Sequence, residues 1–239
     1  MFYLGAGTSG RLGVLDAAEC PPTFGTDANL VQGVIAGGAA ALTSAREGAE
    51  DRPEDACTDL AAREVGPRDF VVGIAASGTT PYVRAGLEEG KRRGAATAIV
   101  ACSPPQPEVL ALVDIAIVPV TGPEVVTGST RMKAGTATKL VLNTITTGAM
   151  IRLGKTFGNL MVDLRATNAK LRDRSERILM EVCGVERKHA RELLGTAGGR
   201  LKIAIVMCKL GVGVEQAEHA LEAGGGIIRR VTGDEPPPV

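Results

Sequence analysis

Two loops rich in glycine and hydroxyl groups are the first chemically suggestive feature of the sequence. Gly5-Ala6-Gly7-Thr8-Ser9-Gly10 follows a short apolar stretch, and Ser77-Gly78-Thr79-Thr80 follows a longer one. Each loop precedes a segment of helical character, where free backbone N–H groups and the positive end of the helix dipole attract an anion. Two such loops at one edge of a sheet predict a cradle for a single phosphate group.

Simpler interpretations of these loops stay open. Ser and Thr are common at helix starts for purely local reasons, so one loop alone would indicate little. The spacing of Gly5, Gly7 and Gly10 also fits a dinucleotide-binding turn, but the next apolar stretch, which ends at Gly37-Gly38, carries no acidic residue to hold a ribose. A tight strand-to-helix turn without ligand is a further possibility.

Two carboxylates have the positions of an acid and base pair. Glu19 precedes Pro21-Pro22 and is expected in the last turn of a helix, whose negative end favours the protonated form. Glu50 precedes a helix expected to start near Pro53, whose positive end favours the ionised form. Groups in such opposite environments suit a general acid and a general base. The alternative is that both are ordinary carboxylates at helix ends.

The elements that must position these groups follow an alternating order. Continuous apolar runs typical of buried parallel strands predict strands over residues 1–4, 31–36, 69–76, 96–102 and 115–120. Helices are expected over 9–19, 39–47, from 53, over 81–94 and over 130–153. This order predicts an α/β fold with a doubly wound, mostly parallel sheet, whose ligands bind at the carboxyl ends of the strands.

The chain changes character after the long helix. From Asn168 the pattern is helical and is interrupted by glycines. The sequence predicts a phosphate-binding α/β domain over 1–165, a small helical unit over 166–233 and a disordered tail over 234–239.

Composition excludes several classes of function. Lys and Arg total 27 and Asp and Glu total 27, so a general affinity for nucleic acid or an anionic membrane is not expected. No apolar run reaches the roughly 20 residues of a membrane span. The five Cys form no Cys-x-x-Cys pair, and the two His, His189 and His219, are far apart, so we expect no metal, no cofactor and reduced thiols in the cytoplasm.

The stretch 122–139 (GPEVVTGSTRMKAGTATK) is not a phosphate-binding P-loop, because the Gly-Lys-Ser/Thr ending is absent. Locally it is a loop that leads into a helix, with Ser129 or Thr130 as the expected cap. Arg131 and Lys133 in the first turn oppose the helix dipole, so we expect anionic partners for them.

These motifs together resemble one family. The stretch 122–139, the loop and helix containing LGAGTSGRLGVLD and AECPPT, and the segments EGAED, GIAASG and FGNLMVD are similar to those of the bacterial N-acetylmuramic acid 6-phosphate etherases. Those enzymes have a sugar-isomerase (SIS) fold, which the glucokinase regulatory proteins share. Thr79 stands where the etherases usually carry Arg. Those etherases also normally carry a helical segment before the first strand. The present sequence begins at the strand.

The resemblance implies a function and a site. The expected activity is a lyase reaction of amino-sugar catabolism and peptidoglycan recycling, which cleaves the D-lactyl ether of N-acetylmuramic acid 6-phosphate without a metal or cofactor. Its catalytic glutamates correspond to Glu19, the proton donor, and Glu50. The substrate phosphate is expected at Ser9, Ser77 and Thr80, with Thr8 and Gly78 nearby, in a homodimer. The alternatives are a non-catalytic sugar-phosphate sensor like the glucokinase regulators and an aldose–ketose isomerase.

Overall fold

A computed structural model of the protein describes residues 1–164 and 168–237. The chain folds into two compact units. The first unit comprises Met1–Glu19 and Ala28–Ile145, and the second comprises Cys20–Asp27 and Thr146–Val239. The domain boundary expected at residues 165 and 166 lies outside the described residues, as do residues 238 and 239 of the expected tail.

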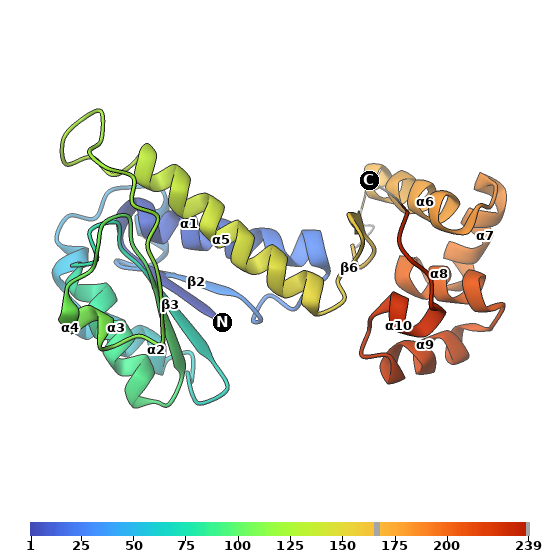
Figure 1. Cartoon of the computed structure of the whole chain (residues 1–239), viewed down its shortest axis with the longest axis horizontal. Helices are drawn as coiled ribbons and strands as arrows, with labels where there is room; N and C mark the ends of the chain where they lie inside the picture. Colours follow the sequence, from blue (N-terminus) through green and yellow to red (C-terminus); the bar gives the residue numbers. More distant parts are fainter. Residues whose placement is uncertain (165–167, 238–239) are drawn as a thin grey trace. The chain divides into compact units, whose positions relative to one another are not determined.

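The first unit is built on a parallel sheet of five strands in the order β2-β1-β3-β4-β5 (Figure 1). The strands are β1 (Phe2–Gly5), β2 (Gln32–Ile35), β3 (Phe70–Ile74), β4 (Ala96–Val100) and β5 (Ile115–Ile117). The predicted α/β sheet and its five strands are confirmed. Because β1 lies between β2 and β3, the strand order reverses there, and this is where open α/β sheets bind their ligands.

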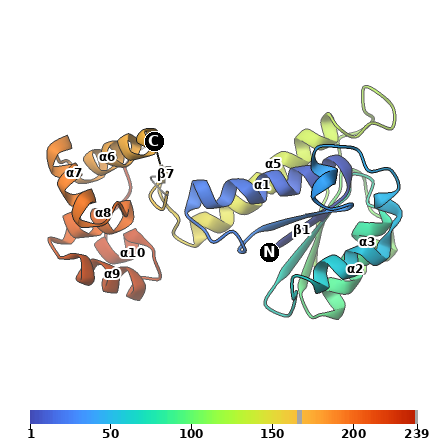
Figure 2. The ribbon, with the colours of Figure 1, turned by 180° about the vertical axis from the view of Figure 1, so that it is seen from behind.

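Helices cover both faces of this sheet. In both views α1 (Gly7–Phe24) runs beside α5 (Lys133–Arg152), while α2 (Pro53–Ala61), α3 (Pro81–Arg92) and the short α4 (Pro107–Leu110) cover the opposite face (Figures 1 and 2). Side chains alternate across β1 accordingly. Leu4 packs in the cluster that α2 and α3 close, whereas the Tyr3 hydroxyl donates to the carbonyl oxygen of Leu142 on α5 at 3.4 Å.

The first helix is longer than the sequence predicts. The helix expected over residues 9–19 runs from Gly7 to Phe24 and contains Pro21 and Pro22. A proline lacks an N–H donor and crowds the carbonyl four residues earlier, yet the N–H of Gly25 still bonds the Pro21 carbonyl at 3.0 Å. Cys20 and Phe24, four residues apart, are both buried, and this burial accompanies the extra turn.

Two other helix boundaries differ from expectation. The helix expected over 39–47 is a single 3-10 turn, Ala39–Leu42, and beyond it the carbonyls of Leu42 and Ser44 accept hydrogen bonds from Arg11 of α1. The helix expected from residue 130 starts at Lys133. Its start is set by the carboxylate of Glu124 and not by Ser129 or Thr130.

In its described residues, the second unit's regular structure is helical apart from one hairpin. The hairpin pairs β6 (Thr156–Phe157) with β7 (Leu160–Met161). The helices are α6 (Ala169–Cys183), α7 (Arg187–Thr196), α8 (Leu201–Leu210), α9 (Val214–Ala223) and α10 (Ile228–Thr232). The predominantly apolar α8 supplies six buried residues to this unit's core. Within the described ranges, none of the helices combines the length and apolar character needed to cross a bilayer.

Candidate active site

The two hydroxyl-rich loops meet at the carboxyl edge of the sheet. Gly5 at the end of β1 pairs with Ile74 at the end of β3, so the first loop (residues 5–10) and the second loop (residues 77–80) leave neighbouring parallel strands. The juxtaposition predicted from the sequence is therefore present. It lies at the reversal of strand order, where ligands of such sheets bind.

In the first loop, close packing of the backbone accounts for two of the glycines. A Cβ on Gly5 would lie 2.7 Å from the nitrogen of Gly10, and a Cβ on Gly10 would lie 2.6 Å from the carbonyl oxygen of Gly5. Residue 5 must therefore touch residue 10, which folds α1 tightly back on β1. Thr8 and Ser9 fall in the first turn of α1 and lie among its unsatisfied N–H groups.

The second loop is fixed by its own hydroxyl groups. The Ser77 hydroxyl lies 2.8 Å from that of Thr79 and accepts the Thr79 backbone N–H at 3.3 Å. Ser103 donates from its hydroxyl to the carbonyl of Ala76 at 3.2 Å. Gly78, with φ 74°, makes the left-handed turn that brings the chain to Thr80 and the start of α3. The Thr80 side chain makes no capping bond to α3 within the described chain, so its hydroxyl can face a ligand.

The start of α5 lies at the same edge of the sheet, and its free N–H groups already bind a carboxylate of the chain. The Glu124 carboxylate accepts the backbone N–H groups of Lys133 and Ala134, each at 3.0 Å. These bonds hold the pKa of Glu124 below its ordinary value, and the bond from Ala134 has the largest effect. The charge of Lys133 adds to the lowering. The Lys133 ammonium itself donates to the carbonyl oxygen of Pro123 at 3.0 Å, so Glu124 is a nearby negative charge and not the ion-pair partner expected for that side chain. A Cβ on Gly135 would lie 3.7 Å from Cγ2 of Thr8, which places this helix start beside the first loop.

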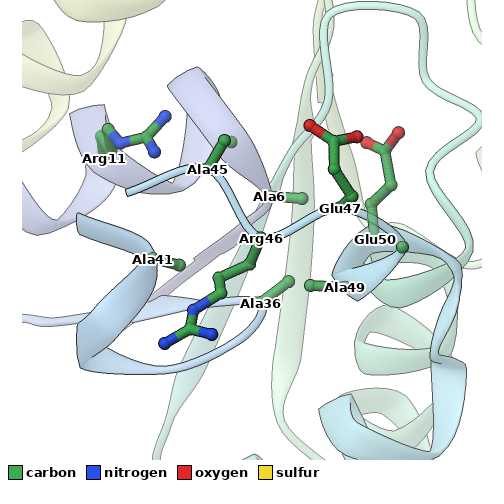
Figure 3. A pocket seen from close by; sticks show the side chains of 11 residues that line it. Ala6, Arg11, Ala36, Ala41, Ala45, Arg46, Glu47, Ala49 and Glu50 are labelled. Carbon is green, nitrogen blue, oxygen red and sulfur yellow. The ribbon is translucent and has the colours of Figure 1, made fainter. Parts of the chain in front are cut away.

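A cavity of about 170 Å³ opens between the first loop and the segment 42–50. Its lining combines small side chains with charged ones: Ala6, Gly7, Arg11, Ala36, Ala41, Ala45, Arg46, Glu47, Gly48, Ala49 and Glu50. The side chains of Glu47 and Glu50 extend in the same direction, whereas that of Arg46 points the other way (Figure 3). The structure therefore brings Glu50, the predicted base, to the same cavity as Gly7 of the first loop.

Sequence reasoning missed two residues of this cavity. Glu47 lies three residues before Glu50, and that spacing is the signal that could have found it. Arg11 carried no such signal, because its contacts are with main-chain carbonyls more than 30 residues away.

Glu19 is not brought to this cavity within one chain. It is exposed on α1, 12 residues beyond Gly7, which at 1.5 Å per residue is about 18 Å along the helix. The expectation that Glu19 occupies a last helical turn is also wrong, since α1 continues to Phe24. The dipole argument for its role as an acid therefore does not hold.

Groups suited to metal binding are not gathered in the described residues. Across residues 1–164 and 168–237, His, Cys, Asp and Glu side chains form no group of three that could hold an ion. The polar groups at the sheet edge are hydroxyls, backbone N–H groups, the carboxylates of Glu47 and Glu50, and the guanidinium groups of Arg11 and Arg46.

The fold defines an α/β protein with two hydroxyl-rich helix starts at the carboxyl edge of a parallel sheet. Comparisons with known proteins narrow this class. Residues 1–91 match the family profile of the glucokinase regulatory protein N-terminal SIS domain. N-acetylmuramic acid 6-phosphate etherases of Crocosphaera subtropica and Mycolicibacterium smegmatis are each 53% identical, over 96% and 98% of this chain and 75% and 78% of their own lengths. That of Vibrio vulnificus is 55% identical over 98% of this chain and 78% of its own. The chain belongs to the N-acetylmuramic acid 6-phosphate etherase family.

Proposed function

We propose that the protein cleaves the D-lactyl ether of N-acetylmuramic acid 6-phosphate with water, giving N-acetylglucosamine 6-phosphate and D-lactate. The observation that carries this proposal is that Glu50 and Gly7 line one cavity. A sugar whose phosphate is held at Thr8, Ser9, Ser77, Gly78 and Thr80 then presents its carbon chain to a carboxylate. Etherases 53–55% identical to the chain support the same substrate.

The reaction needs a base, an acid and a water molecule. In the open-chain sugar the C1 aldehyde acidifies the C2 proton, which Glu50 removes. The C3–oxygen bond then breaks, the lactyl oxygen takes a proton from an acid, and a C2–C3 double bond forms. Addition of water across that bond gives the product sugar. Each proton-transfer group contributes about 10²–10⁴-fold to such a rate.

The acid in this proposal is Glu19 of a second copy of the chain. Glu19 and Leu15 are four residues apart and share one face of α1, and Leu15 is 52% exposed. Further large apolar side chains are exposed on α5 and the loop before it, namely Val125, Val126, Met132 and Leu140. Exposed apolar surface of this kind is typical of an interface. A homodimer that covers it would carry Glu19 of each subunit toward the cavity of the other.

The test is release of D-lactate from N-acetylmuramic acid 6-phosphate. Glu50→Gln and Glu19→Gln should each abolish turnover while sugar-phosphate binding persists, and Glu54→Gln, an exposed acid at the start of α2, is the control. If the site is shared, unfolding and refolding the two inactive variants together restores activity, since mixed dimers contain one intact site. No recovery would place both carboxylates in one subunit.

A non-catalytic sugar-phosphate sensor is the second candidate, favoured by the match of residues 1–91 to the regulatory protein's SIS domain. It predicts sugar-phosphate binding with no lactate released. The presence of Glu50 in the cavity and the etherase relatives favour turnover.

A further inference from the structure

Arg11 connects the phosphate loop to the segment that bears Glu50. It lies on α1, three residues after Thr8, and lines the same cavity as Glu50 (Figure 3). Its Nε donates to the carbonyl oxygen of Leu42 at 3.0 Å, and its Nη2 donates to that of Ser44 at 3.3 Å. Two bonds from one planar guanidinium fix both the distance and the orientation of what they hold.

The segment 42–50 has few other anchors. Its backbone hydrogen bonds within the described chain are local: the N–H groups of Thr43 and Ser44 bond Ala40, that of Ala49 bonds Arg46, and that of Asp51 bonds Gly48. Almost all of its side chains are exposed. The packing anchor is Gly37, where an added Cβ would lie 3.2 Å from the Cβ atoms of Ala49 and Arg46. Ala49, beside Glu50, also packs against the core cluster that α2 and α3 close. The segment is therefore anchored at its end by packing and at its start, at Leu42 and Ser44, by the two bonds from Arg11.

We propose that Arg11 is a positioning residue, which sets Glu50 at the correct distance from the substrate phosphate. The inference rests on the proposed function. The start of α1 binds the phosphate, and Arg11 on the next turn of that helix holds the segment with the base. One rigid helix therefore fixes both ends of the reacting sugar. The guanidinium bonds main-chain carbonyls and not the nearby carboxylates, so it acts through the segment.

The size of the effect follows from geometry. A displacement of about 1 Å in a catalytic group costs on the order of 10²-fold in rate. Loss of the two bonds should therefore lower kcat and leave KM nearly unchanged, because the phosphate ligands are untouched.

The experiment compares Arg11→Met and Arg11→Lys with the wild-type protein in kcat, KM and amide hydrogen exchange of residues 43–50. We expect Arg11→Met to lower kcat about 10–100-fold, to change KM less than about 3-fold and to speed exchange of that segment. Arg11→Lys, which can restore one bond, should recover part of kcat. Arg84→Met on α3, which loses only an exposed ion pair with Glu88, is the control and should change neither readout.

Each other outcome has a definite meaning. A rise in KM with kcat unchanged would overturn the proposal and make Arg11 a substrate ligand. Unchanged exchange of residues 43–50 would also overturn it, and this can be read in Arg11→Lys if Arg11→Met does not fold. If the wild-type protein releases no D-lactate, the proposed function fails, whereas the exchange result still tests whether Arg11 holds the segment.

Discussion

The carboxylate of Glu89 accepts a hydrogen bond from Nε of Arg93 at 2.6 Å, across one turn of α3. Arg92 adds two bonds to the same carboxylate, both at 2.7 Å. These contacts lower the pKa of Glu89 from 4.5 to about 2, and the hydrogen bonds from Arg92 have the largest effect. Burial of the carboxylate opposes the shift. A nearly buried acid near the end of α3 is thus kept ionised by the two arginines that follow it.

The Glu89→Gln substitution should therefore destabilise the fold in a pH-dependent way. A depressed native pKa stabilises the fold fully above the unfolded value of 4.5, and the contribution disappears as pH falls through about 2. At pH 7 we expect a loss of about 1–3 kcal/mol, measured by urea unfolding. The loss should shrink between pH 4.5 and pH 2. Glu88→Gln, which breaks only the exposed pair with Arg84, should change the midpoint little, and an equal loss there would contradict the assignment.

The start of α5 gives a second prediction. Glu124→Gln removes the negative charge that two backbone N–H groups share at Lys133 and Ala134. We expect a fall in Tm of about 1–4 °C at pH 7. Since the pKa of Glu124 is lowered in the fold, its contribution is present above the ordinary pKa of 4.5 and is lost as pH falls through the lowered value. The wild-type and variant melting curves should therefore converge in acid. Ser129→Ala is the control, because Ser129 does not cap the helix.

Close contact between α3 and β1 gives a third prediction. A Cβ on Gly86 would lie 1.8 Å from Cδ2 of Leu4. Gly86→Ala should cost about 1–3 kcal/mol in unfolding free energy, because the core has to shift. Gly148→Ala on α5, where nothing lies within 4 Å, is the matched control and should stabilise by about 0.5–1 kcal/mol. If Gly86→Ala and Gly148→Ala shift the urea midpoint in the same direction and by the same amount, the close contact between Gly86 and Leu4 does not restrict the residue at position 86.

The second loop gives a fourth prediction, which concerns affinity. Ser77→Ala removes one hydroxyl expected to bind phosphate, and a hydrogen bond to a charged group is worth about 1.5–3 kcal/mol. We expect KM for the sugar phosphate to rise about 10–100-fold with Tm nearly unchanged. Thr58→Val, which removes a hydroxyl bonded only to the Glu54 carbonyl, is the control. A normal KM in Ser77→Ala would exclude that hydroxyl from the phosphate site.

The sequence predicts the sheet well because its signals are local. The run 69–76 is mostly apolar, and β3 is buried as such a run requires. Each of the two loops is recognisable by its glycines and hydroxyl residues directly after an apolar strand. Pairing of β1 with β3 then brings the loops together. The helix starts at Pro53 and Pro81 are likewise found where proline predicts them.

The errors arise where distant residues decide the local structure. Residues 39–47 have helical propensity, but only Ala39–Leu42 form a turn, and the carbonyls of Leu42 and Ser44 bond Arg11, which is more than 30 residues away in the sequence. Pro21 predicts an end to α1, but the burial of Cys20 and Phe24 accompanies another turn. Glu124 caps α5 from nine residues before Lys133, a distance that no capping rule covers. The proposed place of Glu19 depends on a second chain, which no local pattern describes.

The central place of β1 bears on how the protein is made. The strand formed by residues 2–5 pairs on one side with β2 and on the other with β3, which ends at Ile74. A ribosome adds about 5–20 residues per second, so this apolar strand waits several seconds for its second neighbour to be synthesised. During that interval its open edge is exposed to other nascent chains, and we expect a molecular chaperone to bind there first.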